Sequence, residues 1–337
     1  MAIPRSLLRF LLTALTLFCL VVGLNNCSSS TPIDTAASPS AVSSAATQTS
    51  SSSDPQININ SAILSELDKL EAQLGVPALS HRIQASRPYG SVEDLVSKKV
   101  ITQVQFDQIK EQVTIEDIVL TGEAKDVDYM TKLALMKGHM LVAGELLALN
   151  LPEQAEPHLG HPVEEIYVDL QDQLPERKVA EFSDVLTKVQ DLVKSKPNDP
   201  QVKAAYDTAM GAIDKAIAAL SETQRKDPAF TLQVINEMLD TAAAEYTAAI
   251  SGGKISEAIE YQDSRGFVQY AKNTLLKDVE PQLAQKSATT ASQLTTEMEQ
   301  LYKAWPNAVP PTAPVVSIDQ VVAQVKSIEK ASVAARS

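Results

Sequence analysis

Three of the four histidines in this chain of 337 residues lie within 23 positions, at His139, His158 and His161. Neutral imidazole together with carboxylate suits iron, copper, zinc or manganese. His158 and His161 are close in sequence, either His139 or Glu145 could add a third ligand, and Glu164 is a further acid nearby. We therefore predict a site for one divalent transition metal, with the choice among these four left open by the residues. Because ligation requires neutral imidazole, affinity should fall as the pH drops through about 6.5.

The helix that would carry the first of these residues is apolar on almost every side from 133 to 149, which is typical of a buried helix. Lys137, His139 and Glu145 interrupt the apolar surface, and buried polar groups need partners. His139 and Glu145 are six residues apart, which places them roughly 120° apart around the helix, so they do not share a face. An ion pair between Lys137 and Glu145 is the structural alternative to a role as ligand.

Around the other two histidines the sequence predicts irregular structure. Pro157, Gly160 and Pro162 should keep His158 and His161 out of a regular helix. His161 and Pro162 would then begin the next helix, with acids in its first turn, where the helix dipole favours them. That reading needs no metal, and both interpretations remain open at this point.

The first 27 residues have the features of a bacterial export signal. Two arginines precede an apolar run from 10 to 24, which is too short for a comfortable membrane-spanning helix, and the run ends in Leu-Asn-Asn-Cys. This resembles a lipoprotein signal, which implies lipidation of Cys27 and a membrane-anchored protein of the periplasm or the outer face of the inner membrane. An uncleaved anchor or ordinary cleavage nearby is the alternative. Residues 28–54 are rich in Ser, Thr, Ala and Pro, and predict a disordered tether.

Residues 55–120 resemble the secreted competence-type helix-hairpin-helix proteins, above all in Arg-Pro-Tyr-Gly-Ser-Val-Glu-Asp at 87–94. The resemblance implies a small helical module whose glycine-rich hairpin binds DNA phosphate, with Gly75, Arg82 and Arg87 as contacts to DNA or to a protein partner. The chain departs from the family at Val76, where a second glycine is expected, and the second hairpin, 100–104, has no glycine.

The charge of this module argues against nucleic acid. Residues 57–117 contain six bases and nine acids, a net charge of 6 − 9 = −3, and the whole chain carries −13. DNA binding draws most of its affinity from phosphate neutralisation by Lys and Arg. We therefore expect a packing module rather than a DNA-binding one.

The remainder of the chain has helical periodicity without the alternation typical of strands. A histidine-containing segment, 121–175, precedes a helical bundle, 176–305, and a linker with a short last helix, 306–337. We expect helices over about 229–250 and 256–276 within the bundle. The predicted fold class is all-α, a small helix-hairpin-helix module followed by an antiparallel helical bundle.

Two stretches, 245–255 and 260–267, are similar to the periplasmic helical domain attached to some bacterial iron permeases, and more distantly to imelysin-like proteins. The resemblance implies an antiparallel bundle and a role near iron or copper handling. The imelysin pattern G-x-H-x-x-E is not met, so no ligand is transferred from that family. Glu245, Glu260 and Asp263 could hold a hard cation, or they could be solvated acids and helix caps.

No nucleophile–base pair, phosphate-binding loop or cofactor motif stands out, so we do not expect an enzyme. The first hypothesis is a membrane-tethered lipoprotein that binds or delivers iron or copper, with a metal permease or another membrane protein as partner. The second is a scaffold or assembly factor that docks a protein partner. DNA capture through residues 57–117 is the third.

Overall fold

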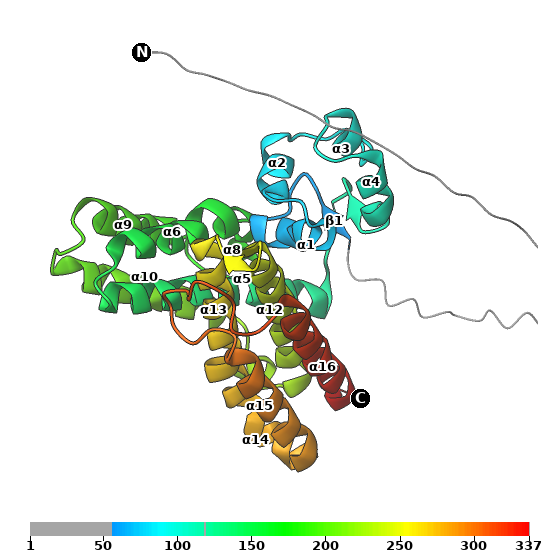
Figure 1. Ribbon diagram of the computed structural model, residues 1–337. Coiled ribbons are helices and arrows are strands. Elements are labelled where there is room, and N and C mark those ends of the chain that lie inside the picture. The colour runs from blue at the N-terminus through cyan, green and yellow to red at the C-terminus, as the bar shows by residue number, and fades with distance from the viewer. Residues whose placement is uncertain (1–55, 118, 337) are drawn as a thin grey trace, which may run out of the picture. The chain divides into compact units, whose positions relative to one another are not determined.

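The computed structural model describes residues 56–117 and 119–336 (Figure 1). The predicted signal peptide, Cys27 and the tether at 28–54 lie outside the described residues. The fold is all-α, as the sequence predicts. The strands are two-residue ladders, which sequence periodicity did not predict because they are too short to show alternation.

The hairpin module has its own hydrophobic core. Its helices are α1 (Leu64–Leu74), α2 (Leu79–Ala85), α3 (Asp94–Ser97) and α4 (Gln103–Ile109). A parallel ladder of β1 (Ile57–Asn58) and β2 (Val113–Thr114) joins the two ends of the module. Apolar side chains from all four helices meet in this core, among them Leu67, Leu70, Ile83, Leu95 and Phe106.

The histidine-containing segment is more helical than the sequence predicts. It consists of α5 (Gly122–Ala148), α6 (Pro152–His161), a π-helix η1 (Pro162–Ile166), α7 (Tyr167–Leu170) and α8 (Gln173–Glu176). The expectation that prolines exclude His158 and His161 from a helix is wrong, because α6 runs through Pro157. Pro162 has no N–H for the usual helical bond, and the chain continues there as a π turn.

The bundle follows with long helices close to the predicted ones. Its elements are α9 (Ser183–Ser195), α10 (Gln201–Ile217), α11 (Glu222–Arg225), α12 (Pro228–Ala248), β3 (Ile250–Ser251), β4 (Lys254–Ile255), α13 (Ala258–Tyr270), the π-helix η2 (Ala271–Leu276), α14 (Lys277–Lys286), α15 (Ala288–Tyr302) and α16 (Ile318–Arg336). The strands β3 and β4 form a hairpin around Gly252 and Gly253, both of which have positive φ. Such a turn favours glycine because other residues pay a steric penalty there.

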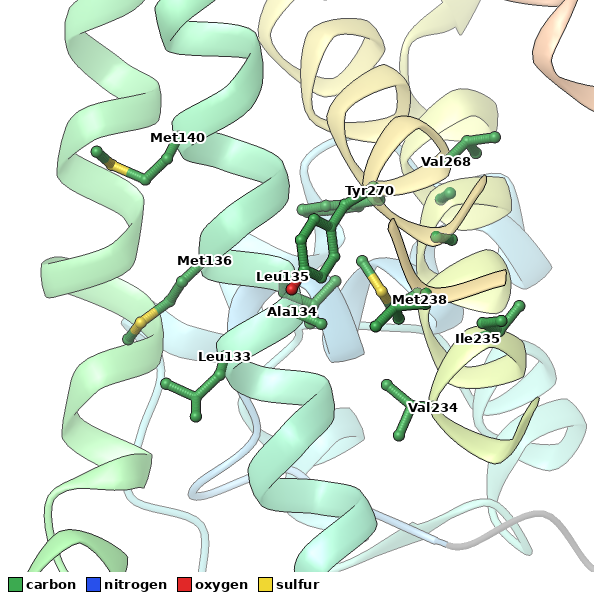
Figure 2. Close-up of a cluster of buried hydrophobic side chains, with 14 of the residues drawn as sticks. Leu133, Ala134, Leu135, Met136, Met140, Val234, Ile235, Met238, Val268 and Tyr270 are labelled. Carbon is green, nitrogen blue, oxygen red and sulfur yellow. The ribbon is translucent and has the colours of Figure 1, made fainter. Parts of the chain in front are cut away.

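Helices α5, α12 and α13 pack around a shared apolar core (Figure 2). Met136 and Met140 of α5, Met238 of α12 and Val268 of α13 are buried in the same hydrophobic cluster. These helices are apolar on most sides because they have neighbours on most sides. The polar residues that interrupt them are therefore forced into the interior, where each needs a partner.

Helices α5 and α13 approach one another at two glycines. A Cβ on Gly266 would lie 2.2 Å from the carbonyl oxygen of Gly138, and a Cβ on Gly138 would lie 2.6 Å from the Phe267 ring. No larger residue fits at this crossing without separating the helices. The close backbone contact fixes the distance between the residues beside it, His139 on α5 and Asp263 on α13.

Candidate metal centre

The structure brings together all three histidines that the sequence singles out, and adds a carboxylate. His139, His158, His161 and Asp263 offer one ligand atom each, and these four atoms all lie within 4.8 Å of one another. His139 comes from α5, the other two histidines from α6 and Asp263 from α13. His158 and His161 are three residues apart on α6, so they share one face of that helix.

Asp263 lies at the middle of the cluster. Its Oδ1 is 2.6 Å from Nδ1 of His139 and 2.7 Å from Nδ1 of His158, and its Oδ2 is 3.2 Å from Nδ1 of His161. The four side chains are buried or nearly so. Three imidazole nitrogens therefore converge on one carboxylate in a place where little water screens them.

The neighbouring Gln262 determines which nitrogen of His158 carries its hydrogen. Gln262 Nε2 donates to the carbonyl oxygen of Ala308 at 3.1 Å and to Oε1 of Gln154 at 3.0 Å. Its Oε1 must then accept from Nε2 of His158, 2.9 Å away. The other nitrogen, Nδ1, then faces Asp263 with its lone pair and is the atom that would bind a cation. Metal-binding histidines are typically oriented in this way, by an acceptor on the nitrogen that does not ligate.

The other two rings pack edge to face around the centre. The His139 ring lies 5.0 Å from the His161 ring and 4.8 Å from that of Phe267, measured between centroids. His139 Nε2 is buried and finds no hydrogen-bond partner among the described residues. His161 Nε2 lies 3.9 Å from Oε1 of Glu165. One further ring, that of Phe267, thus packs against the cluster, and the Nδ1 atoms of the three histidines face Asp263.

The charges in the cluster are strongly coupled. Burial would raise the pKa of Asp263, but the three histidines outweigh it and hold that pKa well below its usual range. Burial lowers the pKa of His139 despite its contact with Asp263. Burial also opposes protonation of His161, yet Asp263, with help from Glu165, raises the pKa of that imidazole to about 9. When no metal is bound, His161 therefore keeps its proton at pH values well above the ordinary histidine pKa.

The donor set fits a first-row transition metal. Metal–nitrogen and metal–oxygen bonds of about 2.0–2.2 Å bring two ligands of one ion no more than about 4.4 Å apart. The widest separation in the cluster is 4.8 Å, so a shift of a few tenths of an ångström would close the four atoms around an ion. Three imidazoles and one carboxylate suit iron, copper, zinc or manganese.

Glu145 and Glu164, the two acids that the sequence offers beside the histidines, form other contacts. Glu145 accepts two bonds from Arg265, at 2.9 Å from Nε and 3.2 Å from Nη2, so it does not reach the cluster. The alternative pair of Lys137 with Glu145 does not form either, because Lys137 binds Asp214 at 2.7 Å. Glu164 accepts from Gln190 Nε2 at 2.9 Å. The 120° between His139 and Glu145 explains why only the first faces α6.

The hairpin residues are occupied with the module's own structure. The carboxylate of Glu71 accepts from the backbone N–H of Ala78 at 2.8 Å and of Ser80 at 3.2 Å, so the hairpin amides already bind an anion. Arg87 donates to the carbonyls of Ile59 and Ala62. Gly75 supplies the positive φ that ends α1, and Arg82 is exposed.

Buried acids elsewhere in the bundle also differ from the sequence expectation. Asp263 and Glu245 are not solvated, since each is at most 4% exposed. From the sequence alone, Asp263 is a possible cation ligand beside Glu245 and Glu260. No sequence pattern joins Asp263 to the histidines, because more than 100 residues separate them.

Residues 221–337 match the model of the iron permease-associated 4-helix bundle domain. The match covers the C-terminal third of the chain and confirms the resemblance seen in the sequence. It includes Asp263, whereas the three histidines lie before it. No curated protein matches the chain, and neither does any solved structure. Within the described ranges, no helix is long and apolar enough to cross a membrane.

Proposed function

We propose that this protein is an extracytoplasmic, membrane-tethered lipoprotein that binds or delivers a transition metal, iron or copper, at His139, His158, His161 and Asp263. The similarity of residues 221–337 to an iron permease-associated domain supports a role in iron or metal uptake. The same similarity suggests a membrane permease as partner. The export signal and Cys27 supply the expected anchor.

The orientation of His158 is the observation that carries this proposal. Its Nε2 is committed to Gln262, so its Nδ1 points at the Asp263 carboxylate, 2.7 Å away, alongside Nδ1 of His139. A neutral imidazole would then present a lone pair to a carboxylate oxygen, which is unfavourable. A cation among these atoms removes the repulsion, because both become its ligands.

The residues of the proposed site have different roles in binding the ion. Asp263 supplies the negative charge that partly neutralises a divalent ion, and the three imidazoles supply nitrogen donors. Gln262 and the Phe267 ring orient His158 and His139, and the apolar core around α5 excludes water. His161 releases its proton when it ligates. This set of nitrogen and carboxylate donors supports binding and delivery of an ion.

Calorimetry on the full chain tests the proposal. Protein in detergent, stripped with chelator and carrying no histidine tag, is titrated with Fe(II) under anaerobic conditions, with Cu(II) and with Zn(II). We expect one strong site per chain, and we expect the double substitution His158→Ala with His161→Ala to abolish it. The substitution His81→Ala changes the one histidine outside the cluster and should leave that site intact.

Circular dichroism of the double variant shows whether it remains helical. If the wild type binds none of the three ions at micromolar concentration, the histidines are structural. The protein would then be better explained as a scaffold or assembly factor that docks a partner.

A further inference from the structure

A second group of titratable residues lies around a cavity of about 870 Å³ beside the metal centre. Its walls come from α1 and the following hairpin, from α12 and from α13. The carboxylates of Asp68, Glu71, Glu165, Glu245, Glu257 and Glu260 line it. His161 and Asp263 of the centre also line it, so the cavity and the centre share a wall. Of the described residues in this lining, none is Lys or Arg.

Glu245 is the most unusual of these acids. Its side chain is 4% exposed and lines the cavity, yet it has no hydrogen bond or ion pair with any other described residue. A buried carboxylate normally has a base or several N–H donors, because an unpaired charge in the interior is costly. Burial raises the pKa of Glu245 well above its ordinary value, and the nearby acids, Asp68 first among them, raise it further.

Asp68 approaches Glu245 from a different segment of the chain. It lies on α1 of the hairpin module, which packs against α12, and it is 8% exposed. Burial raises the pKa of Asp68 to about 8, although the nearby Ser80 hydroxyl acts in the opposite direction. Two carboxylates from separate segments thus lie near one another in the protein interior, and the charges that act most strongly on them are negative.

We propose that this cavity is a second cation site, in which the carboxylates of Asp68 and Glu245 bind a divalent cation that keeps part of its water shell. The ligand class is a cation that prefers oxygen, such as Mn(II) or Fe(II). Its place in metal delivery, as the position a hydrated ion occupies beside the histidine centre, rests on the function proposed above.

The size and chemistry of the cavity agree with this assignment. A cation with six waters occupies roughly 180 Å³, at about 30 Å³ per water, so it fits with room for the carboxylates to approach. Carboxylate and water oxygens are the ligands that Mn(II), Mg(II) and Ca(II) take in proteins. The acidic walls exclude anions. The wall shared with His161 and Asp263 lets an ion pass from oxygen ligands to nitrogen ligands over a short path.

The test separates this site from the histidine centre by using two metals. The full chain, in detergent and stripped of metal, first receives one equivalent of Zn(II), which prefers imidazole. Mn(II) is then added, and electron paramagnetic resonance measures the free ion. We expect one further Mn(II) bound per chain. The double substitution Asp68→Asn with Glu245→Gln should weaken Mn(II) binding at least tenfold while Zn(II) binding is retained.

Two further variants serve as controls. Asp240→Asn removes an acid on the same helix as Glu245 that pairs with Lys326 at 3.4 Å and lies outside the cavity, so it should not change Mn(II) binding. The substitution His158→Ala with His161→Ala should lose Zn(II) and still bind Mn(II). Because Asn and Gln resemble the neutral acids in shape, the carboxylate variant should melt no lower than wild type in metal-free buffer. If the double variant does not fold, Mn(II) binding is measured on the single variant Glu245→Gln, which should also be weakened.

The outcomes distinguish the two proposals. Binding of Zn(II) without any Mn(II), or Mn(II) binding that survives the carboxylate substitutions, overturns the second site and leaves the histidine centre standing. Mn(II) binding that is lost with the carboxylates, in a protein that takes no Zn(II), supports the second site and removes the function proposed for the histidines.

Discussion

The substitution Gly266→Ala should disrupt the proposed metal centre without changing any of its four candidate ligands. The new Cβ would lie 2.2 Å from the Gly138 carbonyl oxygen, and ordinary contact begins near 3.4 Å, so α5 and α13 must separate by about 3.4 − 2.2 = 1.2 Å. His139 is adjacent to Gly138 on one helix, and Asp263 is one turn before Gly266 on the other. Their contact of 2.6 Å would lengthen to nearly 4 Å.

A metal does not tolerate such a change, because ligand distances must fall within about 0.2 Å of their preferred values. The ion would keep the histidines of α6 but lose either His139 or Asp263. We expect affinity to fall by at least the 10- to 100-fold that follows from loss of a supporting contact. Overpacking of this kind costs about 1–3 kcal/mol of stability, which is less than the roughly 5–15 kcal/mol by which native proteins are usually stable.

Calorimetry with Zn(II) and thermal melting measure the two effects. Gly211→Ala is the matched control, because a Cβ at that position on α10 would meet nothing within 4 Å. It should leave affinity unchanged and stabilise the helix slightly. If Gly266→Ala binds metal as tightly as wild type, the crossing of α5 and α13 does not set the geometry of the centre.

Three other predictions concern separate parts of the chain. Because Asp263 raises the pKa of His161 to about 9, protons compete with the metal for this imidazole below that pH. The apparent affinity for Zn(II) should therefore fall about tenfold for each pH unit from 9 towards 7. An affinity that does not change with pH would contradict this. Cys27→Ser should abolish acylation, detected by mass spectrometry and by detergent partition, and an unchanged membrane fraction would exclude this anchor. In gel shifts at physiological salt, duplex DNA should not bind more tightly than micromolar; submicromolar binding that disappears when Arg82 and Arg87 are neutralised would refute this.

The helices could be predicted from the sequence because their apolar stripes are regular. The helix predicted over 229–250 is α12, Pro228–Ala248, and the one predicted over 256–276 is α13 followed by η2. The prolines of α6 wrongly predict irregular structure, because the packing that offsets their local cost is not visible in the sequence. Apolar residues of α6, such as Ala155 and Leu159, are fully buried, and this burial holds the helix together through Pro157.

The histidines of the centre could be predicted from their spacing, but their partner could not. Asp263 belongs to a run of polar residues, Gln262 to Arg265, that are all buried although nothing in their periodicity indicates an interior position. Only the packing of α13 against α5 and α6 shows where they point. The sequence does contain one indication that these residues are buried. Four consecutive polar residues lie between the aromatic Tyr261 and Phe267 on one helix, and such a run requires internal partners if the helix is buried.

These internal partners explain why the centre depends on both halves of the folded chain. The region similar to the iron permease-associated domain begins at 221, so by itself it would contain Asp263 and Gln262 but none of the three histidines. The segment before it supplies the three histidines, and the Arg265–Glu145 pair with the Gly138–Gly266 contact fixes that segment against α13. A metal bound there would join α5, α6 and α13, so the binding energy would also stabilise the docking of the two parts.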